Sequence, residues 1–298
     1  MIADEAVLRR HIAAHPIEGT PEQMRAAFAC LAGATTQVPQ VRVGGVPGRW
    51  FGPADGAPVL WLHGGGYVFG SSVTHSAMAG ALATRLSRPI FVADYRRAPD
   101  HPWPAQLEDA IAVISALGRC DVVGDSAGGH LALNLALAVA GAVETLSLIS
   151  PNTDRTGRST TRGPNSARDA MNDDAADRRL SDLALGGLPE EDPAVSPLLA
   201  DLSDLPPCFV TVATGEVLLD DATLLAVALG RAGVDVTLRV ERGLFHLWPL
   251  WPHATQQAGQ TLDAIARFIS APPVGHVPAS MEQSVPDSRS SPEKHTQE

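Results

Sequence analysis

A serine between glycines is the first place in this sequence where residue types and spacing indicate chemistry. Ser126 lies in the run GDSAGG at 124–129, after a short apolar run and before a helical pattern. Small residues around a serine permit a sharp strand-to-helix turn that lifts the hydroxyl clear of the sheet, where it can act as a nucleophile. Serine and glycine are also common in ordinary loops, so this run alone leaves a structural turn equally open.

A run of glycines earlier in the chain offers groups that could stabilise a negative charge. The sequence HGGGY at 63–67 directly follows the apolar run 59–62. Consecutive glycines cost chain entropy on folding, so we expect them to bring bare backbone amides close to a substrate. The amides of Gly65, Gly66 and Ala127 would then form an oxyanion hole. The alternative, a flexible glycine turn, weakens because the serine motif lies downstream.

A histidine late in the chain has the position expected of a general base. His246 closes the run GLFH at 243–246, just after an expected strand at 234–240. A base that follows the nucleophile and the acid along the chain is one known order of a serine triad. His253 is the nearest rival, and a histidine that only packs in the interior is the structural alternative.

Acidic side chains that could orient this histidine follow an expected strand at 208–212. Asp220 and Asp221 come at the start of a helical pattern, where acids complement the helix dipole. Glu216 lies closer to the end of the strand, so we choose Glu216 as the acid. Its carboxylate would hold the imidazole of His246 in one tautomer and stabilise the imidazolium.

Short apolar runs alternate with longer helical patterns through most of the chain. Expected strands cover 59–63, 90–93, 121–123, 146–149, 208–212 and 234–240. Expected helices cover 21–31, 75–86, 105–117, 127–140, 220–232 and 254–269. Strands that alternate with helices indicate βαβ units, and therefore an α/β fold with a mostly parallel central sheet flanked by helices.

Two segments depart from this alternation, and a third lacks apolar periodicity. Residues 1–40 precede the central strands, and residues 154–195 are polar, rich in Arg and Asp, with helical fragments at best. Because long insertions are often lids, we expect 1–40 and 154–195 to pack together as a small helical cap on a catalytic domain at 41–270. A plain surface excursion is the alternative. The Pro- and Ser-rich residues 271–298 are expected to be a disordered tail.

Composition narrows the class of protein further. The 298 residues are 45% hydrophobic and carry a formal net charge of −11, which indicates a globular protein and disfavours nucleic acid or an anionic membrane surface as a partner. The cysteines Cys30, Cys120 and Cys208 form neither a disulfide framework nor a metal-ligand spacing. No signal peptide or membrane-spanning run is evident, so we expect a soluble cytoplasmic protein.

Taken together, the motifs resemble the hormone-sensitive-lipase-like family of α/β-hydrolases, in its bacterial esterase branch. The motifs are HGGGY at 63–67, DYRRAPDHP at 94–102, GDSAGG at 124–129 and SPL at 196–198. The resemblance covers roughly residues 20–270 and implies the α/β-hydrolase fold. The spacing to Leu218 and Asp220 matches the family's triad acid to Glu216. Dimers occur in the family, so a homodimer is a further expectation.

We therefore expect a serine hydrolase that cleaves small carboxylic esters through an acyl-enzyme intermediate, with Ser126, Glu216 and His246 as its triad. No metal and no organic cofactor are expected, and a small ester or lactone is favoured over a long triglyceride as substrate. A lactone hydrolase or a natural-product tailoring enzyme is one alternative. A non-hydrolytic protein that binds or cyclises a small ligand on the same fold is another.

Aromatic residues near these motifs could line a substrate pocket. Tyr67, Phe69 and Trp248 are the candidates that we single out. Most aromatic side chains serve the core, which is the competing interpretation for each of them. A pure interaction module would rest only on the tail at 271–298.

Overall fold

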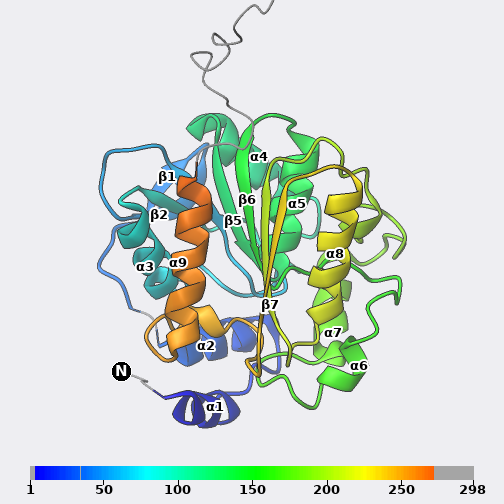
Figure 1. The fold of residues 1–298 in the computed structure, drawn as a ribbon. Helices are drawn as coiled ribbons and strands as arrows, with labels where there is room; N and C mark the ends of the chain where they lie inside the picture. The colour runs from blue at the N-terminus through cyan, green and yellow to red at the C-terminus, as the bar shows by residue number, and fades with distance from the viewer. Residues whose placement is uncertain (1–3, 34, 272–298) are drawn as a thin grey trace, which may run out of the picture.

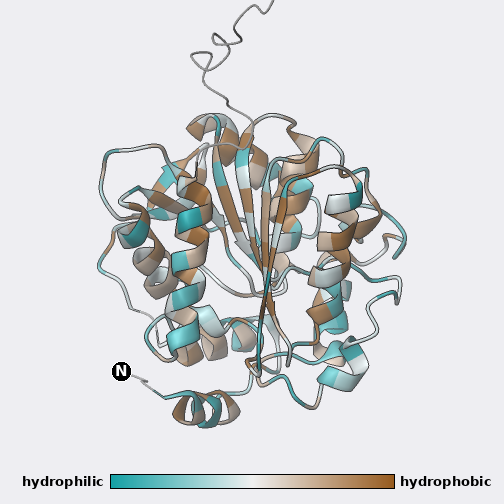
Figure 2. Cartoon of the chain, in the orientation of Figure 1, coloured by the Kyte–Doolittle hydropathy of each residue, from teal (hydrophilic) through white to brown (hydrophobic). Residues whose placement is uncertain are grey.

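The computed structural model describes residues 4–33 and 35–271 and contains a central sheet with helices on both faces (Figure 1). The expected disordered tail at 271–298 lies outside the described residues except for Ala271. Apolar side chains line the strands, while polar side chains gather on the outward surfaces of helices such as α9 (Gln256–Ser270) (Figure 2). The core therefore lies between the sheet and its two helical layers.

The strands of the described residues form one sheet of eight, in the order β1-β2-β4-β3-β5-β6-β7-β8. Their bounds are β1 (Val41–Val43), β2 (Val46–Phe51), β3 (Val59–Leu62), β4 (Ile90–Ala93), β5 (Cys120–Asp125), β6 (Val143–Ile149), β7 (Cys208–Ala213) and β8 (Val236–Glu241). The pairs β1–β2 and β2–β4 are antiparallel, and all other neighbouring pairs are parallel. The prediction of a mostly parallel sheet is confirmed.

The β1–β2 hairpin has no counterpart among the expected strands. Gly44 and Gly45 connect its strands with φ values of 58° and 83°, as a tight hairpin turn requires. Pro47 and Gly48 interrupt the apolar pattern of β2, and both residue types are depleted in strands, so the sequence conceals this strand. A side chain at Gly48 would collide with Phe91 on β4, so close pairing of these strands needs the glycine.

Helices link the parallel strands and cover the sheet. Their bounds are α3 (Ser76–Leu86), α4 (Ala105–Leu117), α5 (Ala127–Ala138), α8 (Leu219–Arg231) and α9. Helix α3 packs against α9, and α4 packs against α5. Residues 127–136 of α5 are all buried, so the helix that follows Ser126 is fixed in the core.

The segments at 1–40 and 154–195 supply helices that lie at one end of the sheet (Figure 1). These helices are α1 (Glu5–Ala13), α2 (Pro21–Ala32), α6 (Arg162–Asn165) and α7 (Asp174–Leu185). The expectation of helical fragments at best is wrong for α7, which runs for 12 residues. Asp173 caps this helix by accepting a hydrogen bond from the Ala176 amide. Its charged outer face hides the helical pattern in the sequence.

The described residues also contain two short 3₁₀ helices, η1 (Pro197–Leu199) and η2 (Trp248–Leu250). Within residues 4–33 and 35–271, no helix has the length and apolar character needed to cross a membrane. Over the same residues, no group of three or more His, Cys, Asp or Glu side chains could hold a metal ion. Cys120 and Cys208 are buried free thiols, and Cys30 is an exposed one.

Candidate active site

Ser126 lies in a strained turn between β5 and α5. Its φ and ψ are 53° and −120°, a combination that residues with side chains rarely adopt. A side chain at Gly124 would collide with the carbonyl of Gly128, and a side chain at Gly128 would collide with the carbonyl of Leu62 on β3. The glycines are therefore needed so that strand, turn and helix can approach one another this closely.

The structure brings Ser126, His246 and Glu216 together although they lie far apart in the sequence. His246 Nε2 is 2.9 Å from Ser126 Oγ, and His246 Nδ1 is 2.9 Å from Glu216 Oε2. An ionised carboxylate can only accept a hydrogen bond, so Nδ1 carries the proton and Nε2 accepts one from the serine hydroxyl. All three residues are buried. This arrangement can move a proton from Ser126 to His246.

Glu216 is held by groups at the ends of neighbouring strands. Its Oε1 accepts hydrogen bonds from the Ala213 amide at 2.6 Å and from the Ser150 hydroxyl at 2.9 Å. Oε2 is thereby left for His246. Because both oxygens are engaged, the carboxylate has one orientation and fixes the imidazole ring that it contacts.

The rival acids and the rival histidine lie elsewhere. Asp221 is buried and pairs with Arg162 at 2.7 Å, while Asp220 accepts hydrogen bonds from the amide and the hydroxyl of Thr160. Both acids tie α8 to the segment between β6 and β7. His253 is exposed. Of the candidates that the sequence leaves open, only Glu216 and His246 contact each other within the described residues.

The charges around His246 support its protonated form. Burial alone would lower the pKa of His246, but the hydrogen bond and the charge of Glu216 outweigh burial. The charges of Asp169 and Asp177 act in the same direction, so the pKa is raised above its ordinary value. A raised pKa helps this histidine to hold the proton that it takes from a serine.

The glycine loop after β3 lies beside the serine turn. Gly65 and Gly66 have φ values of 118° and 58°, and a side chain at Gly66 would collide with Leu180 of α7. In the described part of the chain, the amides of Gly65, Gly66 and Ala127 donate to no other protein group. These amides are therefore left without a protein acceptor, and Gly66 and Ala127 line the pocket beside them.

A buried carboxylate joins the glycine loop to the strand that carries the serine. Asp125 accepts hydrogen bonds from the Gly64 amide at 2.9 Å and the Trp61 indole at 2.8 Å, and it pairs with His75 at 3.1 Å. Burial alone would raise the pKa of Asp125, but the charge and hydrogen bond of His75 and the hydrogen bond of Trp61 lower it. The ionised carboxylate therefore fastens the loop to the turn.

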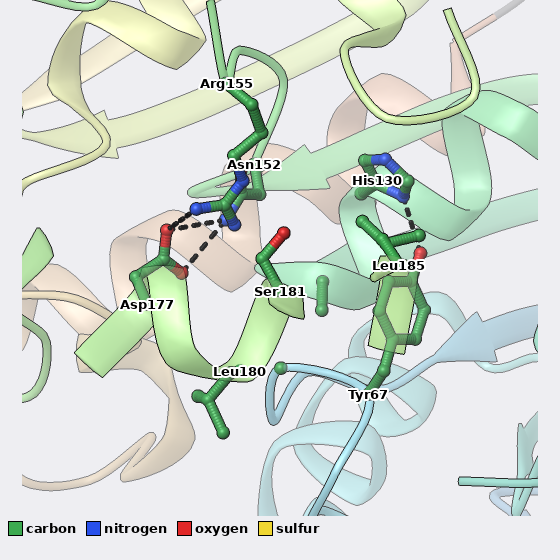
Figure 3. A pocket seen from close by; sticks show the side chains of 10 residues that line it. Tyr67, His130, Asn152, Arg155, Asp177, Leu180, Ser181 and Leu185 are labelled. Atoms are coloured by element: carbon green, nitrogen blue, oxygen red, sulfur yellow. Dashed lines mark hydrogen bonds and ion pairs between the residues drawn. The ribbon is translucent and has the colours of Figure 1, made fainter. Parts of the chain in front are cut away.

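Gly66 and Ala127 line a small pocket. Figure 3 shows the other side chains around it. The Tyr67 hydroxyl is 2.6 Å from His130 Nδ1 on its wall. Burial lowers the pKa of His130 to about 4, so the ring is neutral near pH 7 and Nδ1 accepts from the tyrosine. Leucines of α7 form the apolar part of the wall.

An ion cluster bounds another side of the pocket (Figure 3). Asp177 of α7 accepts hydrogen bonds from Arg155 and Arg162 at 2.6 Å each, and from Asn152 at 3.0 Å. Burial alone would raise the pKa of Asp177, but the two arginine charges hold it well below its usual range. This cluster anchors α7 to the chain that follows β6.

Of the aromatic residues expected in the pocket, Tyr67 lines it and the other two do not. Phe69 packs against Phe28 of α2, with ring centroids 5.0 Å apart. Trp248 is 0% exposed, in η2. Neither is among the residues of the pocket beside Ala127. Phe69 and Trp248 serve the core, which is the common role of aromatic side chains.

Asp169 is a charged residue at the site that the sequence does not single out. It lies between α6 and α7, and its Oδ1 accepts a hydrogen bond from the His246 amide at 2.9 Å. Burial, with the charge of Glu216, raises the pKa of Asp169 to about 6, although the charge of His246 opposes the rise. Nothing in the local sequence distinguishes it from other acids of this segment, because its contacts arise only in the folded chain.

Comparisons with known proteins assign the chain to a family. A family model described by the α/β-hydrolase fold matches residues 59–250. A crystal structure of an esterase from the bacterial hormone-sensitive lipase family has a TM-score of 0.82 and 32% sequence identity, over 88% of this chain and 95% of that one. The chain belongs to the hormone-sensitive-lipase family of α/β-hydrolases. The resemblance expected from the motifs is confirmed.

Relatives of this hormone-sensitive-lipase family member include proteins with named activities. An acetyl-hydrolase of Streptomyces hygroscopicus is 35% identical over 239 residues, which span 76% of this chain and 80% of that protein. An esterase of Acinetobacter venetianus is 31% identical over 251 residues, which span 80% of this chain and 83% of that protein. The similarity therefore extends over most of each protein.

Proposed function

We propose that the protein is a serine carboxylic ester hydrolase that cleaves small esters through an acyl-enzyme intermediate. The observation that carries the proposal is the line of contacts from Glu216 through His246 to Ser126, at 2.9 Å for each step. A serine hydroxyl is a weak nucleophile until an adjacent base removes its proton. The names of the acetyl-hydrolase and esterase relatives support an ester as the substrate class.

In the first half of the proposed reaction, Ser126 Oγ forms a bond to the ester carbonyl carbon while its proton passes to His246 Nε2. The carbonyl oxygen becomes an oxyanion that accepts hydrogen bonds from the amides of Gly65, Gly66 and Ala127. Each such donor typically contributes about 10²–10³ in rate. The intermediate then loses the alcohol, which receives the proton from His246, and an ester of Ser126 remains.

In the second half, water replaces the alcohol. His246 takes a proton from the water as the oxygen attacks the acyl carbon, and the same amides hold the second oxyanion. The bond to Ser126 Oγ then breaks, and the proton returns from His246 to the serine. Glu216 keeps the imidazole in one tautomer and stabilises its cation throughout. The three side chains, the backbone amides and water carry out both halves.

The pocket beside the oxyanion amides supports a short acyl group. The pocket is small, and Leu180 and Leu185 of α7 limit it. Tyr67 and His130 add polar atoms to its lining. An acetyl group is therefore the preferred acyl group in this proposal.

The two expected cap segments are proposed to cover this site. Arg25 of α2 donates a hydrogen bond to the Val68 carbonyl at 2.9 Å, and Leu180 of α7 lies against Gly66. Both segments therefore contact the glycine loop, although about half of the chain separates them. These contacts support a cap built from 1–40 and 154–195 on a catalytic domain at 41–270.

The test is hydrolysis of p-nitrophenyl acetate, butyrate, octanoate and palmitate by the full chain, beside the Ser126→Ala variant. We expect the highest kcat/KM on the acetate, and a loss of at least about 10⁴-fold on replacing Ser126. Mass spectrometry after treatment with a fluorophosphonate should find the label on Ser126, because this reagent mimics the acylation step.

Ser203→Ala is the matched control, since Ser203 is exposed and far in sequence from the site. It should retain wild-type rates. Folded protein that turns over none of the esters faster than the Ser126→Ala variant would overturn the esterase proposal. In that case hydrolysis of lactones is the next activity to test, followed by binding of a small ligand without hydrolysis.

A further inference from the structure

Asp169 contacts both loops that carry the proposed acid and base. Its Oδ1 accepts a hydrogen bond from the His246 amide at 2.9 Å, and its Oδ2 accepts one from the Val217 amide at 3.1 Å. Val217 is the residue after Glu216. One side chain therefore joins two backbone segments whose side chains must meet for catalysis.

The loop that carries Asp169 is itself restrained. Asp169 Oδ1 also accepts a hydrogen bond from the Met171 amide at 3.1 Å, which closes a tight turn before α7. On the other side, Asn165 of α6 donates a hydrogen bond to the Glu216 carbonyl at 2.7 Å. The segment between β6 and β7 thus contacts the loop of Glu216 at more than one point. Through Asp169 it also contacts the backbone of His246.

A carboxylate is the side chain that these contacts require. Amide donors approach both oxygens of Asp169, so an asparagine in its place would direct its own N–H groups at one of the donors. The negative charge of Asp169 also favours the protonated form of His246. Loss of the carboxylate would therefore disturb both the placement and the proton affinity of the base.

Other charged groups face Asp169 from the surrounding elements. Glu216 and His246 face it from the triad loops. The same cavity is also lined by His15 and Glu18, from the connection between α1 and α2, and by Asp173 and Arg179, at the start of α7 and within it. Among these groups, the hydrogen bond to the His246 backbone links Asp169 to the base directly.

We propose that Asp169 is a positioning residue that sets the base and the acid relative to each other by binding the amides of His246 and Val217 from the cap segment. This inference rests on the proposed function. It differs from the triad assignment because Asp169 contacts neither the substrate nor the reacting atoms. It acts through the backbone of the residues that do.

The test compares Asp169→Asn with wild type in steady-state hydrolysis of p-nitrophenyl acetate across pH 5 to 9. We expect kcat to fall by roughly tenfold to a hundredfold, because misplacement by about 1 Å costs rates of this order, while KM changes less than about threefold. The acid limb of kcat/KM should move to lower pH, because loss of the negative charge lowers the pKa of His246.

The matched control is Asp173→Asn. Asp173 lies four residues away and caps α7, and asparagine caps helices equally well, so we expect wild-type rates and an unchanged acid limb. A second variant, Asp169→Glu, keeps the charge but lengthens the side chain. Its acid limb should stay at the wild-type position while kcat is still reduced, which separates charge from geometry.

The inference is overturned if Asp169→Asn matches wild type in kcat and in pH profile, or if it loses rate with an unmoved acid limb, since the latter indicates a structural role alone. Should Asp169→Asn not fold, Asp169→Glu decides, and a wild-type kcat for that variant overturns the inference. The proposed function fails differently. It fails when wild type itself shows no hydrolysis that depends on Ser126.

Discussion

The serine and its glycine loop are held by Asp125, a residue of the central strand, whereas the acid and the base are held by Asp169, a residue of the segment between β6 and β7. Asp125 is fully buried, and its partners lie on β3, on the loop after it and at the start of α3. Asp169 is partly exposed, and its partners are backbone amides of two loops. Ser126, the glycine loop and Asp125 therefore form a sheet-borne half of the site. Glu216, His246 and Asp169 form a loop-borne half, which is held from outside the sheet.

Substitutions in the two halves should therefore have different effects on folding and on catalysis. A change in the sheet-borne half acts on folding as well as on catalysis, because a buried ionised carboxylate without its partners is costly. A change in the loop-borne half acts mainly on the geometry and the pKa of the base.

Glu216→Gln should lower kcat about 10³–10⁴-fold while the protein stays folded. Glutamine can donate a hydrogen bond to His246 Nδ1, which places the imidazole proton on the wrong nitrogen. The measurement is kcat on p-nitrophenyl acetate, with Asp220→Asn as the control, since Asp220 contacts Thr160 instead of His246. An equal loss in both variants would show that the acid has been assigned wrongly.

Asp125→Asn should lower the free energy of unfolding by about 1–3 kcal/mol, because one of the donors around this buried position loses its acceptor. Asp169→Asn should lower it by less. Urea unfolding at pH 7 measures both. The folded pKa of Asp125 is depressed, so its ionisation contributes stability above the unfolded pKa of about 3.9, and that contribution is lost as pH falls through the folded pKa.

The difference in stability between wild type and Asp125→Asn should therefore shrink in acid. If the two proteins unfold at the same urea concentration at pH 7, the hydrogen bonds of the Asp125 carboxylate do not stabilise the glycine loop. If Asp169→Asn is the less stable of the two variants, the contrast between the halves is reversed.

The pH dependence of kcat/KM should show an acid limb above about pH 6.5, the ordinary pKa of histidine. The pKa of His246 is raised, chiefly by Glu216 against the effect of burial, and a protonated imidazole cannot take the serine proton. Activity should thus fall about tenfold for each unit of pH below that limb. An acid limb below about pH 6.5 would contradict the raised pKa.

Leu180→Ala should have the smallest effect, a change of a few-fold in acyl preference. Removing this side chain enlarges the pocket beside Gly66, so the ratio of kcat/KM for butyrate to that for acetate should rise. Leu183→Ala is the control, because Leu183 is an exposed residue of the same helix. An unchanged ratio would show that α7 does not limit the acyl group.

The sequence predicts the sheet-borne half of the molecule better than the rest. The strands β3, β4 and β7 are apolar runs because both of their faces are buried. The glycines near Ser126 are visible because a side chain at their positions would collide with the backbone. Hairpin β1–β2 is missed because Pro47 and Gly48 break its pattern. Helix α7 is missed because few of its residues are buried and one of these is Asp177, so the sequence shows no apolar stripe.

The loop-borne half is predicted only in part, for a physical reason. Glu216 is predicted because a triad acid must lie near the end of its strand, and Asp220 and Asp221 lie farther along. Asp169 is not found because its partners are backbone amides, which every residue possesses, so no residue type marks the contact. The disordered tail, the cytoplasmic location and the homodimer stay predictions.

Helix α7 brings Leu180 onto the glycine loop, and this contact has a consequence for how such a protein can diversify. The chemistry belongs to the sheet and its loops, while part of the wall that limits the acyl group belongs to a surface helix. Substitutions at Leu180, which is only partly buried, can therefore retune which esters are accepted without changing the triad. A library restricted to Leu180 and Ser181, the partly buried residues of α7 that line the pocket, is thus the starting point for redesigning acyl preference.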